Sequence, residues 1–459
     1  MPTQTPSVVA APRPVPEAPI GSGVSSAPGP LGRTYRIRAD VDGTARFAHC
    51  WDGARTALLE AMLATLASTH PGIAVESDVG EGAVMRERLV TALASGSPPD
   101  VVMVKSDATP YFADQDALLP LDDLMARDGI ARDWFGASDL ASSTWGGRVF
   151  GLPQVAAGAQ HLLFVNTGLL ARIGVDPTGP IETWQDLEAL IEPARNAGLL
   201  VLDPTRSARG VTGHQLLTYA NGGGYWDRMQ ERVTWADGPG VQAAAWMLRF
   251  VQAQTGSYER LVGGGATGSS ARLPLQPAEW AREKALCCVN GDGWLYQLSQ
   301  EAPQLQYAVY PFPRNADNRA STGATPSTGA WMLSIPRAAR NHEAAWEIVK
   351  YATVSPEACG FTTRQRRPSP LAGCDEASGL ARSEPTWPAI STSIARSVTV
   401  PVSPIQPRLE QIASEMQDDL LLERRSPRAA LESAALDAQR LLDAWHASGP
   451  HASSAQRPG

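Results

Sequence analysis

The sequence lacks the features that mark several large classes of protein. No stretch approaches the ~18 consecutive apolar residues of a membrane helix. Basic residues are not in excess, because 39 Lys and Arg face 47 Asp and Glu for a net charge of −8, which argues against a general nucleic-acid binder. Charged residues make up 19% and hydrophobic residues 43% of the 459 residues, as expected for a soluble globular protein. This length allows about three ordinary domains or two large lobes.

Cysteine is scarce, and its spacing excludes common metal and redox motifs. There are five cysteines and no CxxC pair, which argues against a zinc ribbon or a thioredoxin-like site. Cys359 and Cys374 either pair across a loop in an oxidising compartment or are small buried thiols, and the sequence leaves both interpretations open. Cys287 and Cys288 are adjacent, and since a bridge between neighbours is strained, we interpret them as packing residues.

Motifs for familiar catalytic sites are also missing. The sequence contains neither a Walker A motif nor GxSxG. His342 and Glu343 begin a zinc-protease-like pattern, but Trp346 stands where the second histidine is needed. Residues 263–268 spell GxGxxG, yet prolines follow where a dinucleotide site needs a helix, which favours a surface loop. The seven histidines are scattered, so we expect neither a metal site nor a cofactor.

The two ends of the chain read as segments outside the fold. Eight prolines lie within residues 1–33, and proline lacks the backbone donor that packed elements need, so this segment is predicted to be a disordered linker. Its only apolar run, 8–11, is shorter than a signal peptide requires. The chain is therefore either cytosolic or has its targeting segment outside this sequence. Residues 448–459 are predicted to be a disordered tail.

Between residues 34 and 104, strand and helix patterns alternate. The predicted strands are 34–39, 73–75 and 101–104, and the predicted helices are 59–66 and 85–93. Such alternation is typical of βαβ units in a parallel sheet. Ligands of these sheets lie beyond the carboxyl ends of the strands, which directs attention to the loops at 49–51 and 105–109.

Similar patterns continue through the rest of the chain. Strands are predicted at 162–165, 285–289, 307–310 and 330–335, and helices at 241–251, 343–351 and 409–445. Thr183 is a predicted helix N-cap, but Asp186 stands where a capping box prefers Glu or Gln, so the box is expected to be imperfect.

Tryptophan is abundant, with thirteen residues. Trp246 and Trp346 fall within helical patterns and are predicted to be core residues. Trp51, Trp226 and Trp294 instead follow turn residues. An aromatic face beside carboxylates suits a sugar, because the ring stacks on C–H groups while polar side chains bond the hydroxyls. Core packing explains any one of these three equally well, but all three in one cleft would point to a sugar site.

Nine short fragments, in this order, carry a resemblance. They are 93–102 (LASGSPPDVV), 118–122 (LLPLD), 149–153 (VFGLP), 163–170 (LFVNTGLL), 174–177 (GVDP), 183–187 (TWQDL), 290–294 (NGDGW), 310–313 (YPFP) and 329–331 (GAW). Together they resemble the family 1 extracellular solute-binding proteins of ABC importers, the maltose-binding-like group. The resemblance covers roughly residues 35–447.

The resemblance implies an α/β, two-lobed periplasmic-binding-protein-like fold of type II, with a hinge and an interlobe cleft. The chain is then expected to cross between lobes near Gln154, Arg319 and Ser355. Lobe 1 would contain 34–154 and 319–355, and lobe 2 would contain 155–318 and 356–447. The tail helices should pack mainly on the second lobe. Ligand binding should favour a closed hinge state.

The resemblance also implies a set of ligand-binding residues. The family's aromatic platform falls on Trp294, and its acidic hydroxyl-binding position falls on Asp107, beside Lys105. The remaining candidates lie in aligned loops or in the matching fragments: His49, Trp51, Tyr225, Trp226, Asp292, Trp331, Trp387 and Arg366. Arg364, Arg366 and Arg367 either form a solvated basic face or face the cleft, where they would favour an anionic ligand.

The leading functional prediction is a non-catalytic receptor for a mono- or oligosaccharide. It would act as a monomer and deliver its ligand to the transmembrane subunits of an ABC permease, in the periplasm or as a lipid-anchored surface lipoprotein. Three alternatives stay open at this point. One is a binder of a phosphorylated polyol such as a glycerol phosphate diester. The second is an enzyme on a two-lobed α/β scaffold, and the third is a binding protein repurposed as a sensor or adhesin partner.

Overall fold

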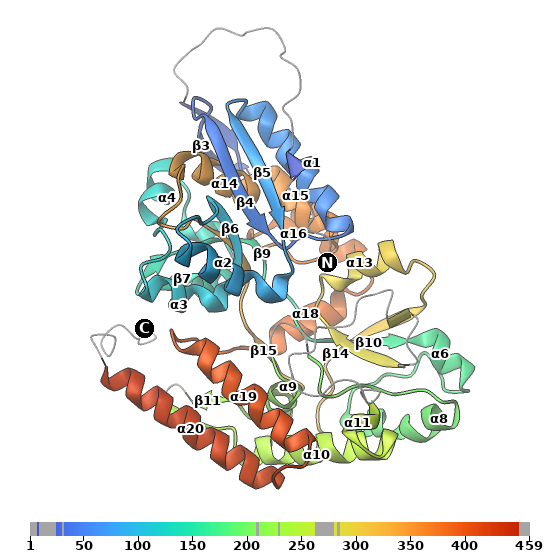
Figure 1. Ribbon diagram of the computed structural model, residues 1–459. Coiled ribbons are helices and arrows are strands. Elements are labelled where there is room, and N and C mark those ends of the chain that lie inside the picture. The colour runs from blue at the N-terminus through green and yellow to red at the C-terminus, as the bar shows by residue number, and fades with distance from the viewer. Residues whose placement is uncertain are drawn as a thin grey trace. The chain divides into compact units, whose positions relative to one another are not determined.

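The computed structural model describes residues 7–8, 24–29, 32–207, 211–227, 230–261, 280–281 and 285–448 (Figure 1). They divide into two compact units. Unit 1 contains the described residues up to Ala157 and those from Thr328 to Glu384. Unit 2 contains those from Gly158 to Ser327 and from Pro385 onward. The α/β, two-lobed fold class predicted from the sequence is confirmed.

Unit 1 is built on a six-stranded sheet of order β1-β5-β4-β6-β16-β9. Its strands are β1 (Ser7–Val8), β4 (Gly43–His49), β5 (Ile73–Val79), β6 (Val101–Lys105), β9 (Leu152–Val155) and β16 (Trp331–Ser334). β4 is parallel to β5 and β6, and β16 is antiparallel to β6 and β9. The predicted parallel βαβ arrangement is therefore present. The expected strand at 101–104 is buried throughout, as a strand covered on both faces must be.

The central strand β4 was not predicted. Residues 43–49 were included in a loop, because Phe47 is their only large apolar residue and the alternation is weak. The strand predicted at 34–39 exists as β3 (Thr34–Arg38), but it pairs with β2 (Val24–Pro28) outside the six-stranded sheet. In the six-stranded sheet, the strand that precedes β5 in the parallel arrangement is therefore β4 and not the predicted strand at 34–39.

Helices cover the sheet of unit 1. They are α1 (Ala54–Thr69), α2 (Met85–Ala94), α3 (Thr109–Asp114), α4 (Asp122–Asp128), α5 (Ala137–Ser142), α14 (His342–Val354), α15 (Pro356–Arg364), α16 (Cys374–Ser378) and α17 (Leu380–Ser383). A small hairpin joins β7 (Thr144–Trp145) to β8 (Arg148–Val149). Helix α14 packs against β4, β6, β9 and β16, and α1 packs against α14, α15 and β5 (Figure 1).

The amino-terminal segment departs from the predicted linker. β2 pairs antiparallel with β3, and Ser7 and Val8 pair with the edge of β5. These stretches lie between the prolines, and Pro28 ends its strand at a sheet edge, where the missing N–H is tolerated. Arg33 follows, and its guanidinium lies 5.6 Å from the ring centroid of Trp134. Part of residues 1–33 thus belongs to unit 1.

A buried ionic network joins three elements of unit 1. Lys350 Nζ on α14 donates to Arg36 O on β3 at 2.7 Å and to Asp128 Oδ2 on α4 at 2.7 Å. Burial disfavours the charge of Asp128, but hydrogen bonds from Arg127 and Lys350 outweigh that effect and lower its pKa. Paired in this way, the buried charges fix the docking of α4 and β3 against α14.

Unit 2 contains a three-stranded antiparallel sheet of order β13-β10-β14. Its strands are β10 (Leu162–Asn166), β13 (Cys287–Asn290) and β14 (Tyr307–Pro311). Two two-stranded sheets accompany it, formed by β11 (Trp226–Asp227) with β12 (Arg232–Val233) and by β15 (Thr325–Ser327) with β17 (Ser397–Thr399). All residues of β10 are buried, which agrees with its apolar sequence.

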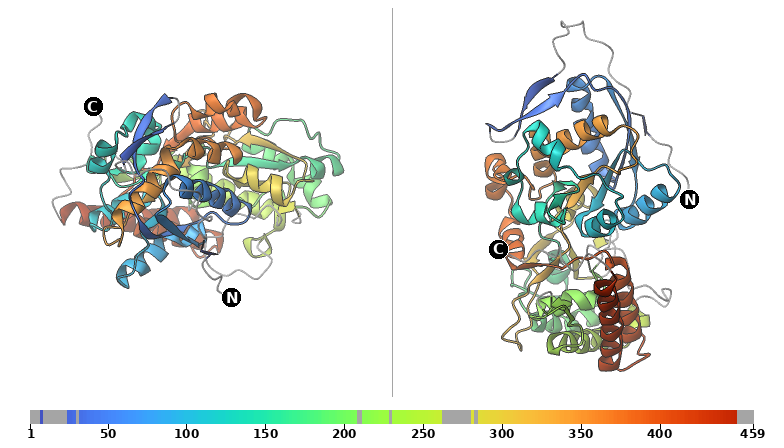
Figure 2. Two further views of the ribbon diagram at one scale, coloured as in Figure 1. Left: turned by 90° about the horizontal axis from the view of Figure 1, so that it is seen from above. Right: turned by 90° about the vertical axis from the view of Figure 1, so that its left-hand side faces the viewer.

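Helices make up most of unit 2. They are α6 (Thr167–Arg172), α7 (Trp184–Ala189), α8 (Ile191–Asn196), α9 (Gly213–Ala220), α10 (Gly238–Thr255), α11 (Tyr258–Leu261), α13 (Trp294–Glu301), α18 (Trp387–Arg396), α19 (Gln406–Leu421) and α20 (Pro427–Ala447). The tail helices α19 and α20 lie side by side, in dark red in Figure 2, and α20 packs on α10. Their apolar residues join the main core of unit 2.

The N-terminus of α7 corrects the expected imperfect cap. Thr183 Oγ1 accepts from Asp186 N at 3.1 Å, and Asp186 Oδ2 accepts from Thr183 N at 2.8 Å. Both bonds of a capping box are therefore present. The shorter aspartate reaches the backbone N–H as a glutamate would.

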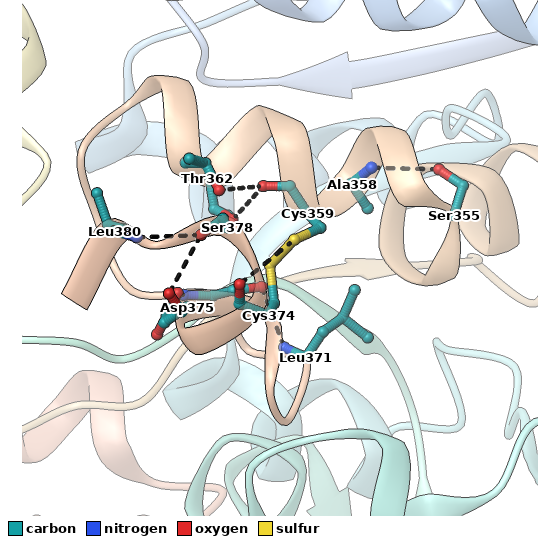
Figure 3. Close-up of a disulfide and its surroundings, with 11 residues drawn as sticks. Ser355, Ala358, Cys359, Thr362, Leu371, Cys374, Asp375, Ser378 and Leu380 are labelled. Carbon is teal, nitrogen blue, oxygen red and sulfur yellow. Dashed lines mark hydrogen bonds between the residues drawn. A yellow bond between two sulfur atoms is a disulfide. The ribbon is translucent and has the colours of Figure 1, made fainter. Parts of the chain in front are cut away.

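The segment after residue 355 differs most from the predicted lobe boundaries. Residues 356–384 were assigned to the second lobe, but they belong to unit 1. Helix α15 packs against α1 and α14, and a disulfide between Cys359 and Cys374 joins α15 to the start of α16 (Figure 3). Phe361 and Cys374 lie in the core of unit 1. Conversely, 319–327 belong to unit 2, where β15 pairs with β17.

Each unit has its own hydrophobic core. Among the described residues, one buried cluster lies in unit 1 and two lie in unit 2. Trp346 belongs to the core of unit 1 and Trp246 to that of unit 2, as predicted. Cys287 and Cys288 are buried and take no part in the disulfide, which also agrees with the packing interpretation. In the ranges that the structure describes, each helix is either too short or too polar to cross a bilayer. The glycine run 263–268 lies outside the described residues.

Candidate functional site

A polar group lies at the carboxyl end of the parallel strands in unit 1. Lys105 ends β6, and its Nζ lies 3.1 Å from Asp107 Oδ2 in the turn that follows. The same Nζ donates to Thr328 Oγ1 at 2.7 Å. The side chains of Lys105 and Asp107 remain 16% and 13% exposed, so both retain access to solvent. The sequence analysis named Lys105 and Asp107 as neighbouring site residues, and in the structure their side chains form an ion pair.

Trp331 lies at the same end of the sheet. It is the first residue of β16, and its Cα partner across the ladder is Lys105. Gly82, after β5, approaches the ring so closely that a Cβ there would stand 3.3 Å from Trp331 Cη2. An aromatic ring, a carboxylate and an ammonium group therefore gather at one edge of unit 1, which is a set that suits a polyhydroxylated ligand.

His49 ends β4, but its imidazole is fully engaged inside unit 1. Its Nδ1 accepts from Trp51 N at 3.1 Å, and its Nε2 lies 2.6 Å from Ser77 Oγ. A backbone N–H can only donate, so the proton of the neutral ring must be on Nε2. Burial lowers the pKa of His49 to about 4, although the Asp78 carboxylate opposes that shift. His49 is therefore neutral and fully buried at this edge.

Trp51 lies in the core rather than at the surface. It is 1% exposed, and its ring packs edge-on against Phe361 with 5.3 Å between centroids. The Arg55 guanidinium lies 5.5 Å from the ring centroid, and the indole N–H donates to Gln154 Oε1 at 2.9 Å. These contacts differ from those of the exposed stacking platform that the sequence suggested.

In unit 2, Tyr225 and Trp226 differ in exposure. Tyr225 is 5% exposed, and its hydroxyl hydrogen bonds to His214 Nδ1. His214 Nε2 lies 2.9 Å from Gly240 O, a carbonyl that can only accept, so Nδ1 is the acceptor and the tyrosine donates. Burial raises the pKa of Tyr225 and lowers that of His214 to about 4. Trp226, at the start of β11, is half-buried.

Asp292 and Trp294 form part of the internal framework of unit 2. Asp292 Oδ2 accepts from Ala159 N at 2.8 Å, and Gly158 adopts φ +60° where a Cβ would collide with that carboxylate. Trp294, the first residue of α13, is 3% exposed and lies 5.0 Å from Phe164 and 5.4 Å from Trp280 between ring centroids. The predicted aromatic platform is thus packed against other aromatic rings.

The last two candidates lie in different units. Trp387 begins α18 in unit 2, where it is half-buried against a core cluster. Arg366, in unit 1, holds a two-point ion pair with Glu384, at 2.6 Å for Nε–Oε2 and 3.0 Å for Nη2–Oε1. Its neighbour Arg367 is 1% exposed. Of the three arginines predicted either to form a solvated basic face or to face the cleft, only Arg364 is exposed.

The comparisons with known proteins decide the family. The model of the bacterial extracellular solute-binding proteins matches residues 52–358. The chain belongs to this family. Its members are binding proteins, and this family implies an extracytoplasmic location.

Relatives of this solute-binding protein extend over most of the chain. A binding protein of Brucella abortus (strain 2308) is 23% identical over 383 residues, which cover 81% of this chain and 87% of the relative. An ABC transporter solute-binding protein from Thermotoga lettingae, bound with α-D-tagatose, has a TM-score of 0.74 at 19% identity and covers 87% of this chain and 100% of its own. Maltose-bound MalE3 of T. maritima has a TM-score of 0.72 at 17% identity, covering 87% and 99%. These solved structures establish the shared fold.

Three residues at the edge of unit 1 were not identified from the solute-binding protein's sequence. Gln154 contacts Trp51, Thr328 contacts Lys105, and Gly82 lies against Trp331. Only Gln154 carried a signal, since it directly follows the matching fragment 149–153. In the described part of the chain, no three histidine, cysteine or acidic side chains are grouped to hold a metal ion. The ligand contacts of the eleven candidates stay predictions.

Proposed function

We propose that this solute-binding protein binds a neutral mono- or oligosaccharide. The observation that carries the proposal is the group formed by Lys105, Asp107, Thr328 and Trp331 at one end of the unit 1 sheet. A carboxylate accepts hydroxyl protons, an ammonium group donates to hydroxyl oxygens, and an indole offers an apolar face to sugar C–H groups. The structural relatives bound with tagatose and maltose support this class of ligand.

Within the proposed site, the candidates fall into two roles. Lys105, Asp107 and Trp331 of unit 1 and the half-buried Trp226 and Trp387 of unit 2 are assigned to ligand contact. A second set is assigned to holding the surrounding framework, because each member is buried and its polar atoms or ring contact other groups of its own unit; this set consists of His49, Trp51, Tyr225, Asp292 and Trp294. Trp331 is also buried, at 8% exposed, and is assigned to ligand contact for its place opposite Lys105.

An anionic ligand has less support than a sugar. A phosphorylated polyol would need arginine side chains to bind the phosphate in a two-point geometry. Arg366 already makes such a contact with Glu384, whose side chain is only 3% exposed. A phosphate would have to displace that carboxylate. The proposal therefore assigns Arg366 to the framework of unit 1 as well.

The proposal includes a partner and a location. As a monomer, the protein would deliver its sugar to the transmembrane subunits of an ABC permease, in the periplasm or anchored by lipid to the cell surface. The family supports an extracytoplasmic location. The Cys359–Cys374 disulfide supports it too, because disulfides persist in oxidising compartments.

The proposal is tested by titrating the purified protein with mono-, di- and phosphorylated sugars while tryptophan fluorescence and thermal unfolding are recorded. A sugar at a hundred times its Kd should stabilise the folded state by about 2.7 kcal/mol. Asp107→Asn should weaken binding of that sugar by about tenfold or more, since hydrogen bonds to charged groups contribute roughly 1.5–3 kcal/mol. Asp133→Asn, at an exposed position of unit 1, is the matched control and should bind like the wild type. Unchanged melting curves across the whole panel would contradict the proposal.

A further inference from the structure

Gln154 is a buried carboxamide whose orientation is fixed. It lies in β9 and is 1% exposed. The indole N–H of Trp51 donates to Gln154 Oε1 at 2.9 Å. Because an indole N–H can donate but never accept, the oxygen of the amide must face Trp51. The amide nitrogen of Gln154 therefore points away from Trp51.

That amide nitrogen has no hydrogen-bond partner among the described residues. A buried donor without a partner destabilises a protein by about 1–3 kcal/mol. Most buried polar groups in native proteins are paired, so an exception calls for a physical explanation. In a binding protein, an oxygen of the ligand is one such explanation.

The position of Gln154 connects it to the polar group of unit 1. The pairing of β9 with β16 shifts register, since Trp331 pairs with Val155 and Met332 pairs with Pro153. Gln154 is the additional residue at this irregularity. Bulges of this kind redirect side chains and occur next to binding sites. Trp331 pairs on its other side with Lys105, so Gln154 lies at the same end of the sheet as the Lys105–Asp107 pair.

We propose that Gln154 Nε2 donates a hydrogen bond to an uncharged ligand oxygen, and that Trp51 is the positioning residue that holds the amide in place. This inference rests on the proposed function. Its chemical content is specific, because an amide N–H requires an acceptor such as a hydroxyl or ring oxygen. Trp51, which is 1% exposed, then acts on the ligand only through Gln154.

A double-mutant cycle tests both parts of the inference. Gln154→Met, Trp51→Phe and the double variant are titrated with maltose and α-D-tagatose by calorimetry, and their unfolding temperatures are measured without sugar. Gln154→Met should weaken binding by about fivefold or more, the effect of losing one hydrogen bond of about 1 kcal/mol. Trp51→Phe should weaken binding when Gln154 is present, because the amide loses its orientation. In the background of the Gln154→Met variant, Trp51→Phe should cause no further loss.

The controls separate this inference from the proposed function and from a purely structural role. Gln115→Met changes an exposed glutamine of unit 1 and should bind like the wild type. Wild-type protein that binds neither these two sugars nor any other sugar of the panel contradicts the proposed function and removes the basis of the inference; where another sugar of the panel binds, that sugar replaces maltose and tagatose in the cycle. Wild-type protein that binds while Gln154→Met binds equally tightly overturns the inference alone, whatever its unfolding temperature. Additive losses in the double variant would show that Trp51 contacts the sugar directly and would overturn its positioning role.

Discussion

At the scale of single residues, two buried histidines illustrate how hydrogen bonds determine protonation. His49 in unit 1 and His214 in unit 2 each accept at Nδ1, from the Trp51 backbone N–H and the Tyr225 hydroxyl, respectively. Each keeps its proton on Nε2. A second proton would have to enter between Nδ1 and its donor, where both histidine side chains are fully buried. Burial accordingly lowers the pKa of both histidines to about 4.

These two pKa values predict a loss of stability in mild acid. The unfolded chain binds protons at these histidines near pH 6.5, whereas the folded chain binds them only near pH 4, so stability falls as the pH drops between those values. Between pH 7 and pH 5, each histidine should reduce the free energy of unfolding by about 2 kcal/mol. Urea denaturation of the wild type and of His49→Gln at both pH values checks this. The variant should be less stable at pH 7 but lose about 2 kcal/mol less on acidification, and equal losses in both proteins would contradict the prediction.

The tryptophans show where residue-level prediction from sequence ends. Trp246 and Trp346 were predicted as core from helical spacing, and both are buried. Trp51 and Trp294 follow turns, where sequence favours neither a ligand platform nor the core. Their burial results in part from Phe361 and Phe164, respectively, which come from distant parts of the chain. Such tertiary contacts leave no periodic signal beside the tryptophan itself.

At the scale of elements, periodicity predicted those that have long apolar stripes. The predicted helices at 85–93 and 343–351 and the strand at 162–165 are present with small changes at their ends. Strand β4 was missed because its neighbours, rather than its own side chains, make it a strand. β4 forms backbone hydrogen bonds with β5 on one side and with β6 on the other. This pairing stabilises the strand, although the alternation of its own side chains is too weak to predict it.

The disulfide between α15 and α16 provides a prediction at this scale. Cys359 and Cys374 are 15 residues apart, and the bond ties the loop that carries Arg366 to unit 1. Closing a loop of that length stabilises a protein by about 3 kcal/mol in the chain-entropy model. The double variant Cys359→Ser/Cys374→Ser should lose about that amount in urea denaturation. Dithiothreitol should lower the stability of the wild type and leave the variant unchanged, and a similar loss in both would trace the effect to something other than this bond.

At the scale of the whole molecule, the family could be inferred from short sequence fragments that are spread over both units. The fragments 93–102 and 149–153 lie in unit 1, whereas 163–170 and 290–294 lie in unit 2. Their order identified the fold class, and the match over 52–358 confirmed the family. The roles proposed for Gln154 and Arg366 required coordinates, because they rest on side-chain contacts with Trp51 and Glu384, respectively, that the sequence does not indicate.

Within the described residues, the chain passes between the two units three times, after Ala157, Ser327 and Glu384. Proteins connected in this way can change the relative placement of their units, and a ligand that contacts both shifts the population toward the closed state. Saturating sugar should therefore reduce the radius of gyration measured by small-angle X-ray scattering.

The Asp107→Asn variant tests whether the compaction depends on sugar binding at unit 1. It should require about tenfold more sugar for the same compaction, because it weakens the contact of the sugar with unit 1 while leaving the three connections intact. A radius of gyration that stays constant while calorimetry shows full occupancy would contradict hinge closure. The sugar would then be held by one unit alone, and the half-buried Trp226 and Trp387 of unit 2 would have no part in binding.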